Sequence, residues 1–140
     1  SELKKWTKHH KILFPIHPRT KKKLTKFKLI NDLNAISNLK VCQPLKYNDF
    51  LLQVYKSNFI ITDSGGIQEE TSYLGISCFT IRKNTERPIT ILKGTNKLVK
   101  IKEILSYLKT KKKKKTKISK WDGKTSFRIL KILKKKFNIK

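Results

Sequence analysis

The sequence contains no methionine, although it has 140 residues and begins at Ser1. Since a complete translation product normally starts with methionine, we expect the chain to be a fragment of a longer protein. Its length and its 37% of apolar residues suit one domain with a modest core, and they do not suit two domains. Residues 1–140 are therefore predicted to form a single domain.

Cysteine is scarce as well, and long apolar runs are missing. Cys42 and Cys78 lie in separate apolar segments without a CxxC pattern, which disfavours a disulfide or a metal site and predicts two small, buried, reduced residues. No segment approaches the roughly 18 consecutive apolar residues that span a bilayer, and no signal peptide is recognisable. These features indicate a cytoplasmic protein.

Acidic residues are few: 9 Asp and Glu face 35 Lys and Arg, which gives a formal net charge of +26. Such a charge is typical of proteins that bind nucleic acids or anionic membrane surfaces. The lysines are nevertheless spread along the whole chain, with dense runs at 21–23, 111–115 and 134–136, and arginine, the usual reader of phosphates, is rare. We therefore favour a lysine-rich version of an ordinary fold that binds polyanions weakly and in a salt-sensitive way.

Apolar, strand-like runs alternate with helical patterns along the chain. Strands are predicted at 12–16, 39–42, 59–62, 76–81 and 95–99, and helices at 22–36, 46–56, 67–74, 101–108 and 122–137. Gly75 lies where a helix commonly ends on glycine, and 82–88 reads as a polar loop. This alternation predicts an α/β domain with a parallel sheet, whose ligands bind beyond the carboxyl ends of the strands.

Residues 59–70 are the most informative segment, because a short apolar run leads through a polar glycine pair into a helix start. Gly65 and Gly66 let the backbone approach a ligand closely, and the new helix presents unpaired N–H groups at the same point. The segment therefore predicts an anion site. The other loops that follow predicted strands, 17–20, 43–47 and 82–88, belong to the same edge of the sheet, which predicts one shared site.

Five motifs extend this interpretation over nearly the whole chain. They read FPIHPRT at 14–20, TDSGGIQEE at 62–70, TERP at 85–88, GTNKLV at 94–99 and DGKTS at 122–126. In content, order and spacing they resemble the carboxyl-terminal domain of the non-hydrolysing UDP-N-acetylglucosamine 2-epimerases. The resemblance implies the second half of a GT-B fold, a Rossmann-like parallel sheet with helices on both faces, and a UDP-sugar in the cleft beside an amino-terminal domain that is not in this chain.

The resemblance also implies roles for single residues. Ser64, Gly65 and Gly66 would hold the diphosphate, and Glu70 would accept hydrogen bonds from the ribose hydroxyls. A first-turn glutamate that favours the helix dipole is the alternative for Glu70. Phe50 would pack on the uracil, or would simply belong to the apolar face of its helix.

His17, Arg87 and Arg19 are the remaining candidates that the resemblance provides. His17 would lie at the reaction centre and exchange protons or offset phosphate charge, whereas an isolated loop histidine would be satisfied by backbone groups. Arg87, and less strongly Arg19, would pair with phosphate or sugar oxygens. Either arginine could instead form a structural ion pair with Glu86 or Asp63.

The resemblance implies interconversion of UDP-GlcNAc and UDP-ManNAc by elimination and re-addition of UDP, without a cofactor or metal. The proton-transfer carboxylates would come from the absent domain, so this chain alone is expected to be inactive. Ile89 stands where the family usually has an acidic residue. A GT-B glycosyltransferase and a basic polyanion-binding domain remain alternatives, and a homodimer is a further expected association.

Overall fold

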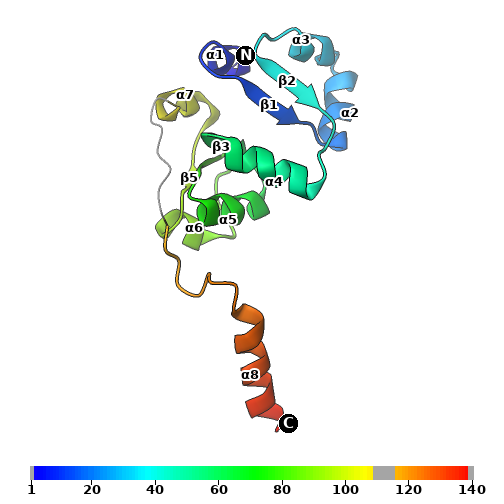
Figure 1. Cartoon of the computed structure of the whole chain (residues 1–140). Coiled ribbons are helices and arrows are strands. Elements are labelled where there is room, and N and C mark those ends of the chain that lie inside the picture. Colours follow the sequence, from blue (N-terminus) through cyan, green and yellow to red (C-terminus); the bar gives the residue numbers. More distant parts are fainter. Residues whose placement is uncertain (1, 109–115, 139–140) are drawn as a thin grey trace. The chain divides into compact units, whose positions relative to one another are not determined.

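The computed structural model describes residues 2–108 and 116–138, and these form two compact units. The first contains the described residues of 1–56 and 100–110, and the second those of 57–99 and 111–140. The single domain expected from the length is thus divided into two groups of elements, which Figure 1 colours along the chain.

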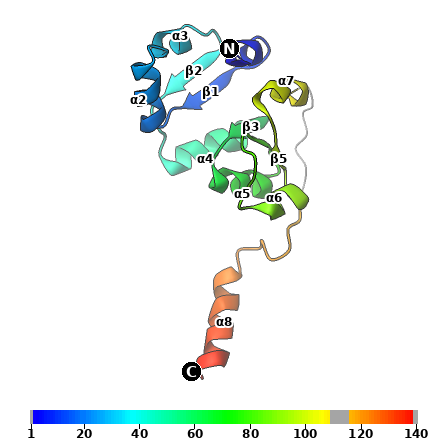
Figure 2. The same cartoon turned by 180° about the vertical axis from the view of Figure 1, so that it is seen from behind.

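The first unit is built on a two-stranded parallel sheet. β1 pairs with β2 in a register that matches Ile12 to Leu39. Figure 2 shows α2 and α3 beside these two strands. In chain order the elements are α1 (Glu2–Thr7), β1 (Ile12–Pro15), α2 (Pro18–Lys26), α3 (Ile30–Asn34), β2 (Leu39–Cys42), α4 (Tyr47–Lys56), the 3-10 turn η1 (Ile101–Glu103) and α7 (Ile104–Tyr107).

The helix predicted at 22–36 is wrong as a single helix, because the chain turns between α2 and α3. Lys28 adopts a left-handed φ of 56°. Its N–H donates to the Thr25 carbonyl at 3.0 Å, and the Leu29 N–H donates to the Leu24 carbonyl at 2.8 Å. This pair of bonds closes the end of α2 as a Schellman motif. The turn lets residues of both helices, Leu24 and Leu33 among them, reach one apolar core around Ile16.

The second unit is built on a three-stranded parallel sheet in the order β3-β4-β5. Phe59 is matched to Ser77, and Cys78 to Asn96. The buried apolar residues of this unit include Ile76, just before β4, and Cys78 and Phe79 in it. Its elements are β3 (Phe59–Thr62), α5 (Gly65–Leu74), β4 (Ser77–Thr80), α6 (Pro88–Leu92), β5 (Asn96–Leu98) and α8 (Thr125–Phe137).

Parallel pairing and the α/β class are confirmed, with the strands divided between two separate ladders. Gly75 ends α5 in the left-handed conformation, φ 72°, as its place in the sequence predicted. Two short helices were not predicted, α1 and α6. The second begins at Pro88, where the missing N–H and the fixed φ of proline favour a helix start.

Gly94 permits a close approach between β5 and α5. A Cβ at this position would lie 2.3 Å from the Ser72 Oγ and 2.5 Å from the Thr90 carbonyl oxygen. Both distances are well inside van der Waals contact, so only glycine fits. The N–H of Thr95, the residue after Gly94, donates to the Ser72 hydroxyl at 3.3 Å. This bond holds the backbone in place just before β5.

The last helix, predicted at 122–137, begins three residues later than expected. Asp122 lies in the preceding turn, where its carboxylate accepts the Lys124 N–H at 3.1 Å and pairs with Arg128. All residues of α8 are at least partly exposed, including Ile129 at 53% and Leu133 at 42%. The lysine run 111–115 lies outside the described residues. Among those described, no helix is both long and apolar enough to cross a membrane.

Candidate functional site

The loop between β3 and α5 has the backbone geometry of an anion site. Ser64 is the N-cap of α5 in an extended conformation, and its side chain makes no capping bond to the helix. Its N–H donates to the Thr62 hydroxyl at 3.0 Å, which ties the loop to the end of β3. The first N–H groups of a helix have no carbonyl acceptors within it, so those at the start of α5 are available to a ligand.

Gly65 and Gly66 differ from the other glycines of this unit, because nothing in the fold requires them. Neither has a positive φ. A Cβ at Gly66 would meet no atom within 4 Å, and one at Gly65 would lie 3.8 Å from the Glu86 Oε2. Glycine also lowers the stability of a helix relative to residues with a side chain. Neither packing nor helix formation therefore explains the glycine pair, whereas close approach of a ligand to the backbone does.

Glu70 follows Gly66 by one helical turn, which places both on the same face of α5. The Glu70 Oε2 is buried and has no hydrogen-bond partner in the structure. The first turn of α5 contains no acidic residue, so Glu70 does not act there on the helix dipole, and that alternative is wrong. A buried carboxylate oxygen without a partner is costly unless a ligand donates to it.

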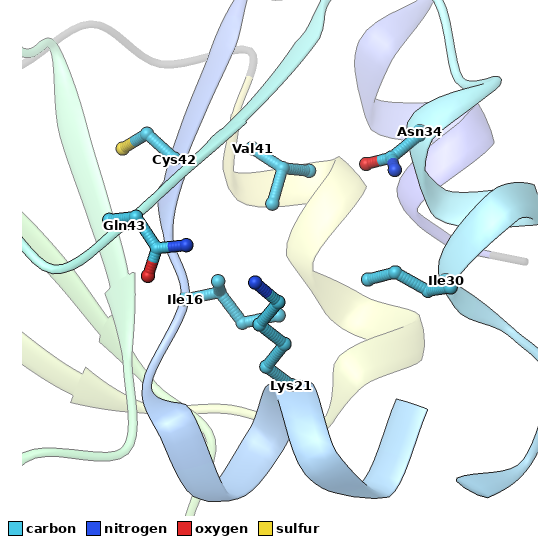
Figure 3. Close-up of a pocket in the computed structure, with 7 residues that line it drawn as sticks. All are labelled: Ile16, Lys21, Ile30, Asn34, Val41, Cys42 and Gln43. Atoms are coloured by element: carbon cyan, nitrogen blue, oxygen red, sulfur yellow. The ribbon is translucent and has the colours of Figure 1, made fainter. Parts of the chain in front are cut away.

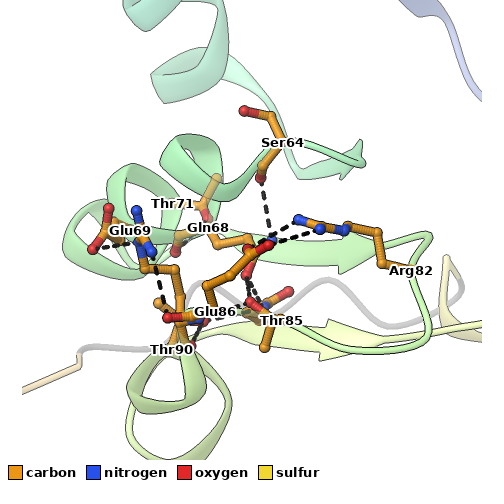
Figure 4. Close-up of polar contacts among 10 residues, drawn as sticks. Ser64, Gln68, Glu69, Thr71, Arg82, Thr85, Glu86 and Thr90 are labelled. Atoms are coloured by element: carbon orange, nitrogen blue, oxygen red, sulfur yellow. Dashed lines mark hydrogen bonds and ion pairs between the residues drawn. The ribbon is translucent and has the colours of Figure 1, made fainter.

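Two exposed ion pairs flank the start of α5 (Figure 4). Arg87 pairs with Glu69 at 3.1 Å, and Arg82 pairs with Glu86 through two bonds of 2.8 and 3.1 Å. Hydrogen bonds from Arg82 lower the pKa of the Glu86 carboxyl. Arg87 thus forms its ion pair with Glu69, and its charge also contributes, less than Arg82, to lowering the pKa of the Glu86 carboxyl. Sequence analysis missed Arg82, which its spacing of four residues from Glu86 could have indicated.

Behind these charges lies a buried polar network, which also includes residues that sequence analysis did not single out. Gln68 is 0% exposed and donates from Nε2 to the Ser64 carbonyl at 3.2 Å. Its Oε1 accepts from the Thr85 hydroxyl at 2.6 Å and from the Asn96 Nδ2 at 2.9 Å. The network therefore links the loop before α5 to the 82–88 loop and to β5. Gln68 could have been singled out as a polar residue within the TDSGGIQEE motif.

The remaining sequence-predicted residues lie in the first unit. His17 is exposed and is the N-cap of α2: its Nδ1 accepts the Arg19 N–H at 3.2 Å. A neutral ring that accepts at Nδ1 carries its proton on Nε2. Arg19 is exposed on α2, and Phe50 is half-buried on α4. His17 thus makes the backbone contact expected of an ordinary loop histidine. That hydrogen bond uses Nδ1 and does not involve Nε2.

The first unit also contains a cavity of about 280 Å³ (Figure 3). Apolar side chains of Ile16, Ile30 and Val41 line it together with Lys21 and other polar groups. Gln43, from the predicted site loop 43–47, lines it, but none of the individually named candidate residues does. Within the described part of the chain, no group of three or more His, Cys, Asp or Glu residues could hold a metal ion.

Both cysteines are free. Cys78 is buried in β4, where burial raises the pKa of its thiol. Cys42 is only half-buried at the end of β2, so the prediction of two buried cysteines is confirmed for Cys78 and is too strong for Cys42. The hydrogen-bond partners of the Cys78 thiol are the uncharged hydroxyls of Thr71 and Thr80, which do not provide the charged environment of a reactive thiolate.

Comparison with known proteins relates this geometry to one family. A family model described as UDP-N-acetylglucosamine 2-epimerase matches residues 1–134. The UDP-N-acetylglucosamine 2-epimerase of Methanocaldococcus jannaschii is 41% identical over 130 residues, which are 87% of this chain and 34% of the relative. That of Methanococcus maripaludis is 48% identical over 93 residues, which are 66% of this chain and 25% of the relative. The chain thus spans about a third or less of these relatives.

Solved structures agree with the sequence comparison. The M. jannaschii UDP-GlcNAc 2-epimerase superimposes with a TM-score of 0.79 at 37% identity and covers 96% of this chain, which corresponds to 38% of that protein. A structure of the same enzyme in complex with UDP-GlcNAc and UDP gives a TM-score of 0.78 at 39% identity, covering 89% of this chain and 35% of that one. The neighbours are GT-B epimerases, so the expected fold class is confirmed.

Proposed function

Because the chain belongs to the UDP-N-acetylglucosamine 2-epimerase family, we propose that residues 1–140 are the carboxyl-terminal, UDP-binding domain of an isomerase that interconverts UDP-GlcNAc and UDP-ManNAc. The complete enzyme needs an amino-terminal domain, since the chain covers only 34% of the M. jannaschii relative. We further propose that the enzyme works in the cytoplasm on a nucleotide-sugar substrate.

The glycine pair is the single observation that carries this proposal. Gly65 and Gly66 have no packing or backbone reason to lack a side chain, and they stand where α5 directs free N–H groups outward. A diphosphate bound there gains hydrogen bonds from the backbone and the favourable end of the helix dipole. The Ser64 hydroxyl, which makes no capping bond, supplies a further donor.

Glu70 and Arg87 complete the nucleotide side of the proposed site. The unpartnered Oε2 of Glu70 provides an acceptor for a ribose hydroxyl. The Arg87 guanidinium, attached to α5 through Glu69, provides positive charge for phosphate or sugar oxygens. Phe50, half-buried on α4, offers a ring for the uracil, and Arg19 a second, weaker source of charge on α2.

His17 is proposed to act on the sugar side. In the forward reaction the bond between C1 and the UDP oxygen breaks as the C2 proton is removed, and both steps reverse with the proton delivered to the opposite face. The bond at Nδ1 holds the imidazole, so the Nε2 edge can donate to the departing diphosphate or take its proton back. The base and acid at C2 are proposed to lie in the amino-terminal domain.

The uncovered face of α8 supports the proposal of a missing partner domain. Ile129, Leu130 and Leu133 are each exposed by 42% or more. The family match extends to residue 134, so this helix lies largely within a fold whose other parts are not in this chain. Exposed apolar side chains of this size favour a covering surface, and we propose that the amino-terminal domain supplies it.

Assembly tests the proposal directly. The isolated chain should bind UDP weakly and epimerise nothing, because orientation between the two halves of the site is lost. Fusion of an amino-terminal domain from a family member ahead of Ser1 should restore formation of UDP-ManNAc without an added acceptor. Turnover that required a sugar acceptor would instead indicate a glycosyltransferase. Binding that ignored uracil and collapsed with salt would indicate a polyanion-binding protein.

A further inference from the structure

The buried network behind α5 holds the backbone of Arg87 from both sides. The Arg87 N–H donates to the Thr85 hydroxyl at 3.0 Å, and the Thr90 hydroxyl donates to the Arg87 carbonyl at 2.7 Å. Each hydroxyl is in turn bound by one of two buried amides. Thr85 donates to the Gln68 Oε1 at 2.6 Å, and Thr90 accepts from the Asn96 Nδ2 at 3.0 Å.

The donors and acceptors of this network fit together in only one arrangement. The Asn96 amide donates to Gln68 and to Thr90, and its Oδ1 accepts from the Thr80 hydroxyl at 2.6 Å. The Gln68 amide donates to the Ser64 carbonyl and accepts twice. Gln68, Asn96, Thr80 and Thr90 are each 5% exposed or less. Turning over the Gln68 amide would place its nitrogen against the Asn96 Nδ2 donor and its oxygen against the Ser64 carbonyl, and turning over the Asn96 amide would place its oxygen against the Gln68 Oε1. Either mismatch inside the protein is costly.

From this geometry we infer that Thr85, together with Gln68 and Thr90, is a positioning residue that fixes Arg87 relative to the start of α5. The inference rests on the proposed function, in which Arg87 and the Ser64–Gly66 loop bind the same diphosphate. Gln68 reaches both: it bonds directly to the Ser64 carbonyl and, through the Thr85 hydroxyl, to the Arg87 N–H. The network therefore sets the spacing between the helix N-terminus and the cation.

The physical benefit lies in preorganisation. A long arginine side chain loses conformational entropy when it binds a ligand. A fixed backbone and the ion pair with Glu69 at 3.1 Å reduce this entropy loss, because the side chain is already restrained before binding. Arg87 itself is partly exposed, whereas the groups that fix it are mostly buried. Its placement is thus controlled by mostly buried groups behind the proposed site.

The test compares the 140-residue chain carrying Thr85→Val with the same chain carrying Thr85→Ser, by titration with UDP and by thermal unfolding. Valine keeps the volume and removes the hydroxyl, and serine keeps the hydroxyl. We expect Thr85→Val to weaken UDP binding about tenfold and Thr85→Ser to bind almost as the unmodified chain does. Thr71→Val is the matched control, since the buried Thr71 hydroxyl bonds to two backbone carbonyls of its own helix, at 2.7 and 3.2 Å, and to the Cys78 thiol, and not to the backbone of Arg87.

A double-mutant cycle separates positioning from general stability. If Thr85 acts through Arg87, Thr85→Val should cost no further UDP affinity in a chain that already carries Arg87→Ala. An equal loss in both backgrounds would overturn the inference, as would full UDP affinity in Thr85→Val. If Thr85→Val fails to fold, Thr90→Val against Thr90→Ser makes the same comparison at the Arg87 carbonyl. An unmodified chain that bound no UDP would overturn the proposed function, and this inference with it.

Discussion

At the scale of single residues, glycine has two opposite roles in the second unit. Gly94 is required by the fold, since a Cβ there would collide with Ser72 and with the Thr90 carbonyl. Gly66 is not required, since the space around it is open. The sequence alone does not distinguish the two glycines. The space around each position does, and it indicates that Gly94 is needed for packing and that Gly66 is free to contact a ligand.

Gly66→Val should abolish measurable UDP binding while leaving the domain folded. The valine side chain enters open space in the free protein and would occupy the position of the bound phosphate. Calorimetric titration with UDP and thermal unfolding measure the two effects. Ser64→Ala should cost about 1 to 3 kcal/mol of binding free energy by removing one donor to a charged group.

Gly94→Ala is the control for this experiment, because it should lower the free energy of unfolding through the steric overlap at Ser72. If Gly66→Val bound UDP as tightly as the unmodified chain, the glycine pair would have no part in the nucleotide site. If Gly66→Val destabilised the chain as much as Gly94→Ala, Gly66 would also be required for packing.

His17 has a structural and a proposed chemical role, and two substitutions distinguish them. His17→Ala removes the cap of α2 and should cost about 1 kcal/mol of stability, whereas asparagine is a good N-cap and should restore it. In the fused two-domain protein, both variants should lower kcat about a hundredfold or more if the imidazole transfers a proton. Full turnover by His17→Asn would mean that capping is the whole function of this residue.

At the scale of elements, the sequence predicts strands better than helix ends. The runs at 39–42 and 59–62 match β2 and β3 residue for residue, because short apolar runs between polar breaks have few other places in an α/β fold. The helix break near residue 28 was missed, because its left-handed residue is a lysine and the sequence shows no glycine there. The actual turn is decided by tertiary packing of Leu24 and Leu33 on one core.

Part of the candidate site could likewise be predicted from the sequence, and part could not. The loop at 62–66, Glu70 and Arg87 could be named from motifs, since chemistry restricts the residue types. The partners of Arg87 could not, because Glu69 and Glu86 are both near in sequence and only the fold selects between them. Gln68 and Asn96 are 28 positions apart, and nothing local predicts that their amides meet.

Lys28→Gly should raise the free energy of unfolding by up to about 1 kcal/mol, because glycine adopts a left-handed φ without the steric cost that a Cβ imposes. Lys26→Gly is the matched control. It removes a lysine of similar exposure from the last turn of α2, where glycine lowers stability by about 1 kcal/mol. Denaturant unfolding measures both. A loss of stability in Lys28→Gly would show that the turn depends on the lysine itself.

At the scale of the whole molecule, the chain combines a strong positive charge with the uncovered apolar face of α8. From the net charge of +26 we expect weak, salt-sensitive polyanion binding. The apolar residues of α8, by contrast, have no covering surface in the described part of the chain. We therefore expect α8 to contribute to assembly with the rest of the enzyme rather than to the stability of this part.

Replacing Ile129 and Leu133 together by glutamate should leave the unfolding of the isolated chain nearly unchanged, because both side chains are already exposed. The same pair in the fused two-domain protein should lower its thermal stability and its turnover, since apolar burial against the other domain would be lost. Lys131→Glu with Lys135→Glu, on the opposite face of the same helix, is the control for charge. Equal effects from both pairs would exclude the apolar face as the docking surface.

The first unit is discontinuous in sequence, and this gives the protein a definite order of completion. Residues 57–99, which form the whole three-stranded sheet, are synthesised before the returning segment at 100–108. That segment contributes Ile104, which is 0% exposed, and Leu108, which is 4% exposed. On the ribosome, where domains generally fold as their residues emerge, the first unit would therefore remain unfinished until the whole three-stranded sheet of the second unit had been made.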